Sequence, residues 1–334
     1  MRLGLGLGLG RWQRVPAPKV LSLTAAAACV WPDYVSVAAT VANADSVRFA
    51  LDGYTTQTVT AAQAAAGIRL LSDGTPPIAG WGSDALLSAT PLRNTQEGVA
   101  HTTPIAVWPW LDGWFGHSGV VHAAGEINSW GGQGLGLLHT AATNLPNLLA
   151  PGSGFSDYTV QTAPGSLERF TSNSLLPYIN GASAFAFLFI GSFEETVASN
   201  VFNFSNSDAT SRLAAYRHST ISDRLIFNVR VAGTSNYVVA TVLDGLPHAY
   251  LFRYAGADAP PRLRVYCDGE LRSGAELGGA VPPTLPANMT LGGLPDISGT
   301  VIETRYAAML ATNSNRPIAD LLLCASTLRA RYLT

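Results

Sequence analysis

Between residues 185 and 310, the chain is a succession of short segments in which apolar and polar residues alternate. In Arg224–Val231, Leu225 and Phe227 fall on one face of an extended strand, whereas the two arginines fall on the other. A period of two is typical of half-buried strands, because an amphipathic helix would repeat its apolar positions every three or four residues. The sequence therefore predicts an all-β fold, with its clearest strands at 185–190, 201–204, 212–216, 224–231, 237–243, 249–254, 262–267 and 300–310.

The sequence also indicates one tight turn and one helix. Asp268-Gly269 lies between two expected strands and is typical of a two-residue hairpin turn. Cys267 ends the preceding strand in an apolar position, so we expect it to be buried and chemically inert. From Ile318 to Tyr332 the apolar residues recur at helical spacing, which predicts a single helix at the C-terminal end of the all-β region.

Residues 31–105 carry a shorter series of strand signals, at 34–41, 46–51, 55–60 and 68–71, with Asp52-Gly53 as a turn. This length and spacing suit a small immunoglobulin-like β-sandwich, although the Cys…Trp…Cys pattern of antibody domains is absent. The sequence therefore predicts three parts: an extended N-terminal docking arm (1–30), a small β-sandwich domain (31–105) and a larger β domain (106–334).

The composition excludes several classes of protein. With 47% hydrophobic and 13% charged residues, the chain has too little charge for a disordered protein. A net charge of −2 lacks the basic excess typical of nucleic-acid binding, and no apolar stretch of about 18 residues predicts a membrane span. Cys29, Cys267 and Cys324 are too widely spaced for a disulfide framework or a zinc pattern. We expect no nucleic-acid partner and no cofactor.

Residues 3–10 read LGLGLGLG. On an extended strand the four leucines would share one side and leave bare backbone on the other. The glycines make such a ribbon costly to order, so it needs another surface to lie on. We expect it to dock into a larger assembly of protein partners, as part of a homo-oligomer, through Leu3, Leu5, Leu7 and Leu9. The alternative interpretation is a processed N-terminus with cleavage before Cys29.

Several stretches resemble a known family. PHAYLFRYAG at 247–256 and PRLRVYCDGEL at 261–271 are similar to paired strands of the laminin-G/concanavalin A-like jelly roll. MTLGG at 289–293 and the segment from residue 299 resemble its following strands and terminal helix. INSWGGQG at 127–134 is similar to the W-x-D-x-S-G-N-G opening of such domains in tailed-bacteriophage structural proteins. Pro247 replaces the usual aromatic residue, Ala255 replaces the aspartate of Y-D-G, and the aspartate after Trp130 is missing.

The resemblance implies that residues 106–334 form a concanavalin A-like jelly roll with a short C-terminal helix. It also implies a virion protein of a tailed bacteriophage, in a tail tip, a fibre or a capsid decoration, assembled in the host cytoplasm and exposed on the particle. The start MRLGLGLGL is similar to that of such proteins. The expected function is non-catalytic adhesion to a host-surface polysaccharide. A secreted or lipid-anchored bacterial adhesin and a polysaccharide hydrolase are the alternatives.

Three tryptophans crowd into the segment VWPWLDGWFGH at 107–117. Their flat rings suit the apolar faces of sugars, so Trp108, Trp110 and Trp114 are candidate glycan-binding residues. The second interpretation, which we favour, is that the rings seal a joint between the two β domains, because an exposed cluster of tryptophans promotes aggregation.

The sequence contains no clear catalytic pattern. A glycan hydrolase needs two carboxylates on one face, but the adjacent Glu194 and Glu195 would point to opposite faces of a strand. Glu303 shares a face with Arg305, which favours an ion pair. The six histidines show no metal spacing, and neither a Gly-x-Ser-x-Gly elbow nor a phosphate-binding loop occurs. We expect no enzyme, no catalytic residue and no metal ligand. Some relatives of the jelly roll bind calcium, but the sequence does not indicate its ligands.

Overall fold

The computed structural model describes residues 16–110, 113–133, 135–139, 146–162, 170–172, 181–193, 200–204, 212–217, 223–231, 233–242, 244–275, 289–291 and 304–334. The chain forms two compact units. The first contains the residues up to Ala27, Tyr34–Ala79 and Ser83–Ala106, and the second contains Ala28–Asp33, Gly80–Gly82 and Val107–Thr334. The domain boundary predicted after residue 105 stays a prediction. No helix among these described residues is long and apolar enough to cross a membrane.

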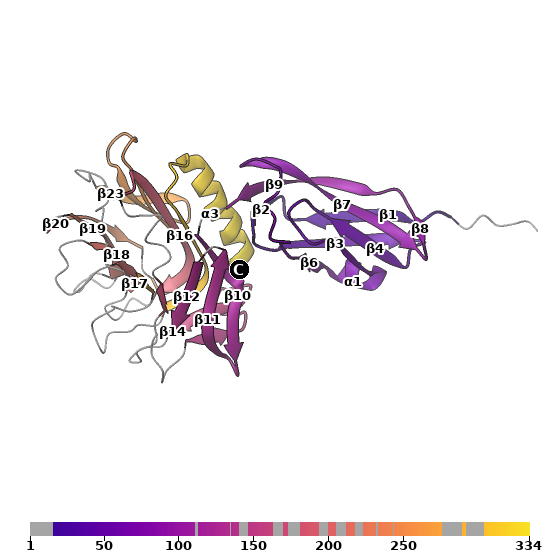
Figure 1. Cartoon of the computed structure of the whole chain (residues 1–334), viewed down its shortest axis with the longest axis horizontal. Coiled ribbons are helices and arrows are strands. Elements are labelled where there is room, and N and C mark those ends of the chain that lie inside the picture. The colour runs from indigo at the N-terminus through magenta and orange to yellow at the C-terminus, as the bar shows by residue number, and fades with distance from the viewer. Residues whose placement is uncertain are drawn as a thin grey trace, which may run out of the picture. The chain divides into compact units, whose positions relative to one another are not determined.

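The first unit is a small β-sandwich (Figure 1). Its elements are β1 (Lys19–Ala25), β3 (Val35–Ala42), β4 (Ser46–Ala50), β5 (Gln57–Thr60), α1 (Ala61–Ala66), β6 (Ile68–Leu70), β7 (Ser83–Arg93), β8 (Gln96–Glu97) and β9 (His101–Pro109), of which residues 107–109 belong to the second unit. One sheet has the order β1-β3-β6, and the other contains β9-β7-β4-β5, with β8 paired to β7. Val35 and Val37 of β3 and Val47 and Phe49 of β4 are buried at alternate positions, as the period of two requires.

The structure corrects the extent of the predicted docking arm. Residues Lys19–Ala25 form β1, which pairs with β3 from Lys19 opposite Ala42 to Ala25 opposite Val37. Residues Ala28–Trp31 form β2, which belongs to the second unit. An arm of 1–30 is therefore too long, because the backbone of residues 19–25 is already hydrogen-bonded within a sheet.

The second unit contains the larger β-sandwich. Its remaining strands are β10 (Gly113–Ala123), β11 (Glu126–Gln133), β12 (Leu135–His139), β13 (Asn147–Leu149), β14 (Thr159–Thr162), β15 (Phe170–Ser172), β16 (Ala184–Phe193), β17 (Asn200–Phe204), β18 (Arg212–Arg217), β19 (Arg224–Val231), β20 (Thr234–Thr241), β21 (His248–Ala255), β22 (Leu263–Cys267), β23 (Glu270–Ala275), β24 (Met289–Leu291) and β25 (Thr304–Thr312). They pair in the order β20-β19-β18-β17-β24-β15-β12-β11-β13-β14-β25-β16-β21-β22-β23, with β10 beside β11 and β25. Because β20 and β23, at the two ends of this order, also contact each other, the sheet folds back around its core.

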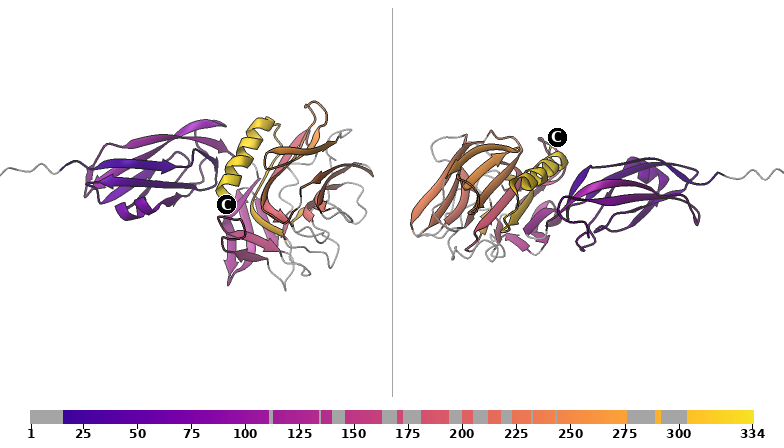
Figure 2. Two further views of the ribbon diagram at one scale, coloured as in Figure 1. Left: turned by 180° about the vertical axis from the view of Figure 1, so that it is seen from behind. Right: turned by 90° about the horizontal axis from the view of Figure 1, so that it is seen from above.

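Strand β16 is buried on both faces. Its Phe185, Phe187 and Phe189 belong to the main hydrophobic core. Its other face lies near helix α3 (Ile318–Tyr332), which contacts β16 and β21 (Figures 1 and 2). The helix buries one stripe of side chains, formed by Leu321, Cys324, Ala325, Leu328 and Tyr332. This packing explains why β16 reads as a continuous apolar run rather than an alternating one.

The fold class predicted from the sequence is confirmed. The chain is all-β, with a small β-sandwich followed by a larger one and a short C-terminal helix. The predicted two-residue turn is also present: Cys267 pairs with Glu270, and Asp268 and Gly269 have φ angles of 53° and 86°. Positive φ at both positions is what this type of hairpin requires. Cys267 is buried, as expected.

Candidate functional site

Two of the three candidate tryptophans are not available to a sugar. Trp108 is 6% exposed and Trp110 is 2% exposed. Within the second unit, the indole N–H of Trp110 donates to the carbonyl of Ala311 at 3.1 Å, and its ring packs against Trp81. Buried rings cannot stack on a ligand, so the predicted glycan platform is wrong for these two residues. The side chain of Trp114 lies outside the described residues, and the joint between domains stays a prediction.

Other predicted residues also lie outside the described part of the chain. They include the leucines of the proposed docking arm, Leu3, Leu5, Leu7 and Leu9, and the carboxylates considered for a hydrolase, Glu194, Glu195 and Glu303. The docking role and the absence of a catalytic pair therefore stay predictions.

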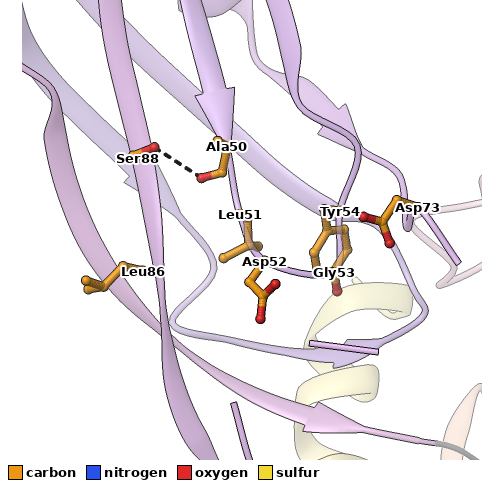
Figure 3. Close-up of a pocket in the computed structure, with 8 residues that line it drawn as sticks. All are labelled: Ala50, Leu51, Asp52, Gly53, Tyr54, Asp73, Leu86 and Ser88. Carbon is orange, nitrogen blue, oxygen red and sulfur yellow. Dashed lines mark hydrogen bonds between the residues drawn. The ribbon is translucent and has the colours of Figure 1, made fainter. Parts of the chain in front are cut away.

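The first unit contains an open pocket of about 370 Å³, with two aspartates in its lining (Figure 3). Both carboxylates accept hydrogen bonds from backbone amides. Asp52 Oδ2 is 2.5 Å from the nitrogen of Ile78, and Asp73 Oδ1 is 2.8 Å from the nitrogen of Thr75. Asp73 stabilises its own turn in this way, whereas Asp52 holds a segment 26 residues further along the chain. We assign the pocket a structural role only.

The most promising polar surface in the second unit is the side of β18, β19 and β20 that faces away from the core. The alternate apolar residues of these strands belong to the hydrophobic core, so the residues between them point the other way. Antiparallel pairing sets Arg212 opposite Arg230, and Asn228 opposite Tyr237. We call this surface the outer face; it comprises Arg212, Tyr216, Asn228, Arg230 and Tyr237.

Asn228 is the unusual residue of the outer face. It is only 6% exposed, and its Nδ2 donates to the hydroxyl of Tyr216 at 3.3 Å. Its Oδ1 is buried and accepts no hydrogen bond from any described residue. A buried acceptor without a donor costs about 1–3 kcal/mol, so such an atom in a stable fold needs an explanation.

Aromatic and cationic side chains surround this amide. Tyr237, on the edge strand β20, is 55% exposed. The guanidinium of Arg212 lies 4.6 Å from the centre of the Tyr216 ring, within the range of a cation–π contact. Burial lowers the pKa of Arg212, and the nearby charge of Arg230 lowers it further. The outer face therefore combines an exposed ring, a buried acceptor and two cations.

A second polar cluster lies where β21 begins and β22 ends. His248 Nδ1 is 2.7 Å from Asp268 Oδ2, and Nε2 is 3.0 Å from Asp244 Oδ1. Hydrogen bonding to the buried Cys267, followed by bonds to Asp268 and Asp244, raises the pKa of His248 to about 10 against the effect of burial. The sequence does not reveal this cluster because its members are far apart along the chain. Only the register that pairs Tyr250 with Cys267 brings them together.

No family model matches the chain, and no curated protein sequence matches it significantly. Solved structures with similarity to it include the receptor-binding domain of botulinum neurotoxin D, with a TM-score of 0.46 and 9% identity over 64% of this chain and 52% of that domain. The binding domain of serotype D has a TM-score of 0.45 with 8% identity over 62% and 50%. That of serotype G has a TM-score of 0.41 with 10% identity over 58% and 48%. The chain thus matches about half the length of each domain. Similarities this low say nothing about the ligand or the origin of this chain.

Proposed function

We propose that the chain is a non-catalytic carbohydrate-binding protein that adheres to a host-surface glycan through its outer face. The observation that carries the proposal is the exposed ring of Tyr237, which lies on the same face as the paired cations Arg212 and Arg230. A ligand with an apolar face and an acidic group would use both at once.

The chemistry of a sugar suits these groups. The C–H face of a pyranose ring is apolar and can cover the exposed ring of Tyr237, while its hydroxyl groups donate hydrogen bonds at the rim. The buried Oδ1 of Asn228 would become accessible to such a hydroxyl only if the amide side chain rotated toward the surface.

The charges of the outer face indicate an acidic saccharide. Arg212 and Arg230 are directly opposite on neighbouring strands, an arrangement of like charges that is unfavourable by itself. A carboxylate or sulfate group between them would be attracted by both guanidinium groups and could bind either in a bidentate manner. We therefore propose that the ligand is an acidic polysaccharide.

The Tyr237→Ala variant tests the site. We expect it to bind acidic oligosaccharides at least about tenfold more weakly, which corresponds to roughly 1.4 kcal/mol. Its melting temperature should not change, because the side chain is 55% exposed. Isothermal titration calorimetry of the full chain, with acidic and neutral oligosaccharides of equal length, measures this effect. Tyr158→Ala is the matched control, since it removes another tyrosine that is 39% exposed in the second unit.

Three outcomes would count against this proposal. Equal affinity of the Tyr237→Ala and native chains would overturn the site, and tighter binding of the neutral oligosaccharides would overturn the preference for acidic ones. Release of new reducing ends from a polysaccharide would favour the hydrolase over the non-catalytic role.

We further propose that the chain is part of a tailed-bacteriophage virion and docks there as one of several copies. The resemblance of INSWGGQG and of the start MRLGLGLGL to phage structural proteins supports this role. The alternative of a lipid-anchored adhesin is less favourable, because cleavage before Cys29 would remove β1, a strand hydrogen-bonded to β3.

Changing Leu3, Leu5, Leu7 and Leu9 to serine tests the docking role without shortening the chain. We expect the variant to fold normally but to be lost from purified particles, because its arm no longer presents an apolar side. Quantitative mass spectrometry of the particles measures its copy number. Incorporation at the native level would contradict the docking role.

A further inference from the structure

We propose that His248, Cys267 and Asp268 form a binding site for a single Zn²⁺ ion. The candidate ligand atoms, an imidazole nitrogen, Sγ and a carboxylate oxygen, all lie within 4.8 Å of one another. They meet because His248 begins β21, whereas Cys267 and Asp268 end β22 and start its turn. Zinc–ligand bonds are about 2.0–2.3 Å long, so small rotations of these side chains would bring the three atoms onto one ion.

The set of donor atoms selects the metal. A thiolate, an imidazole and a carboxylate are the three ligand types that Zn²⁺ accepts in tetrahedral sites. Calcium and magnesium instead require a shell of oxygen atoms, which this cluster does not supply. Three protein ligands leave the fourth position to a water molecule. Binding displaces the proton held by the thiol or the imidazole, and this proton passes to the solvent.

Neighbouring groups already hold the ligands in a suitable orientation. The Nε2 atom of His248 lies 3.0 Å from Asp244 Oδ1, so the carboxylate can accept its N–H while Nδ1 faces the ion. A histidine that binds a metal almost always donates its other N–H to a partner of this kind. The opposite oxygen of Asp268, Oδ1, is held by the backbone N–H of Ala249 and by Arg329 Nε, both at 2.9 Å. Oδ2 therefore stays directed toward His248.

Charge and burial also favour a cation. Cys267 is 2% exposed, and a thiolate in such a place is costly unless a positive charge lies beside it. The thiolate and the carboxylate of Asp268 together carry the two negative charges that Zn²⁺ would neutralise. Because Asp268 also contacts Arg329 of α3, the ion would fix the turn between β22 and β23 against the C-terminal helix.

Cobalt titration of the full, reduced and metal-free chain tests the proposal. Co²⁺ occupies zinc sites and shows a thiolate-to-metal absorption band when a cysteine is a ligand. We expect this band to appear at one Co²⁺ per chain and to disappear when Zn²⁺ is added. Cys267→Ser should lose the band. Cys324→Ser, which removes another fully buried thiol of the second unit, should keep it.

A second variant decides the question if Cys267→Ser fails to fold. The side chain of Asp244 is 51% exposed, so Asp244→Asn should fold normally. It should nevertheless bind Zn²⁺ about 10–100-fold more weakly, because the orienting carboxylate of His248 is lost. The absence of a thiolate band in the native chain, or equal zinc affinity of the native and Asp244→Asn chains, would overturn the proposal. Both readouts are independent of glycan binding.

Discussion

Replacing Arg331 by methionine is expected to lower the free energy of unfolding of the second unit by about 3–5 kcal/mol. The guanidinium of Arg331 interacts with two buried aspartates: Nη2 is 3.1 Å from Asp157 Oδ2, and Nε is 3.6 Å from Asp33 Oδ2. Asp157 is 0% exposed and Asp33 is 6% exposed. The substitution would therefore leave two interior carboxylates without this cation. Helix propensity does not contribute, since methionine and arginine are similar in this respect.

Arg272→Met is the matched control for this substitution. Arg272 Nη2 is 3.1 Å from Glu270 Oε2, but the two side chains are 40% and 72% exposed. Exposed ion pairs contribute about 0–1 kcal/mol, because water solvates the charges well when they are apart. Urea denaturation of both variants and of the native chain measures the difference. An Arg331→Met chain no less stable than the Arg272→Met chain would contradict the role given to the buried ion pairs.

The strands of the second unit could be predicted from the sequence because one face of each is apolar and the other is not. Strand β19 has the bounds that its alternation predicts, and the Asp268-Gly269 turn follows from residue preferences alone. When one face of a strand is buried, its residues must alternate between apolar and polar. A shift of one residue in the pairing would move every apolar side chain to the solvent face.

Strand β1 lacks such an alternation of buried and exposed side chains. Most of its side chains are exposed or half-exposed, and its pairing with β3 shifts register between Val20 and Ser22. Helix α1 did leave a signal: Thr60 Oγ1 accepts from the N–H of Gln63 at 3.2 Å, and Gln63 Oε1 accepts from the N–H of Thr60 at 3.0 Å. The spacing Thr-x-x-Gln before an alanine-rich run is a capping box, which indicates the start of a helix.

The candidate sites depend on register, which a single sequence does not give. The outer-face position of Asn228 follows from its alternation in β19, but its position opposite Tyr237 requires the pairing of β19 with β20. The histidine–cysteine cluster likewise requires the pairing of β21 with β22. Local patterns therefore predict which way a side chain points, whereas the identity of its neighbours is a property of the folded sheet.

Trp130→Ala is the second substitution expected to have a large effect, a loss of about 3–5 kcal/mol in the free energy of unfolding. Trp130 is 0% exposed in β11, and its indole N–H donates to the carbonyl of Gly116 at 3.0 Å. Its ring lies 6.2 Å from that of Tyr306 within the hydrophobic core. Alanine would leave a large cavity and an acceptor without its donor. Thermal and urea denaturation measure the loss.

Trp130→Phe separates these two contributions. Phenylalanine keeps most of the apolar volume but cannot donate to Gly116, so we expect a smaller loss of about 1–3 kcal/mol. The folded fraction of either variant should bind oligosaccharide with native affinity, because Trp130 is buried and cannot contact a ligand. A weaker affinity in a fully folded Trp130→Phe chain would give the INSWGGQG motif a role in binding. Native affinity would mean that the tryptophan in this motif stabilises the fold and takes no part in binding.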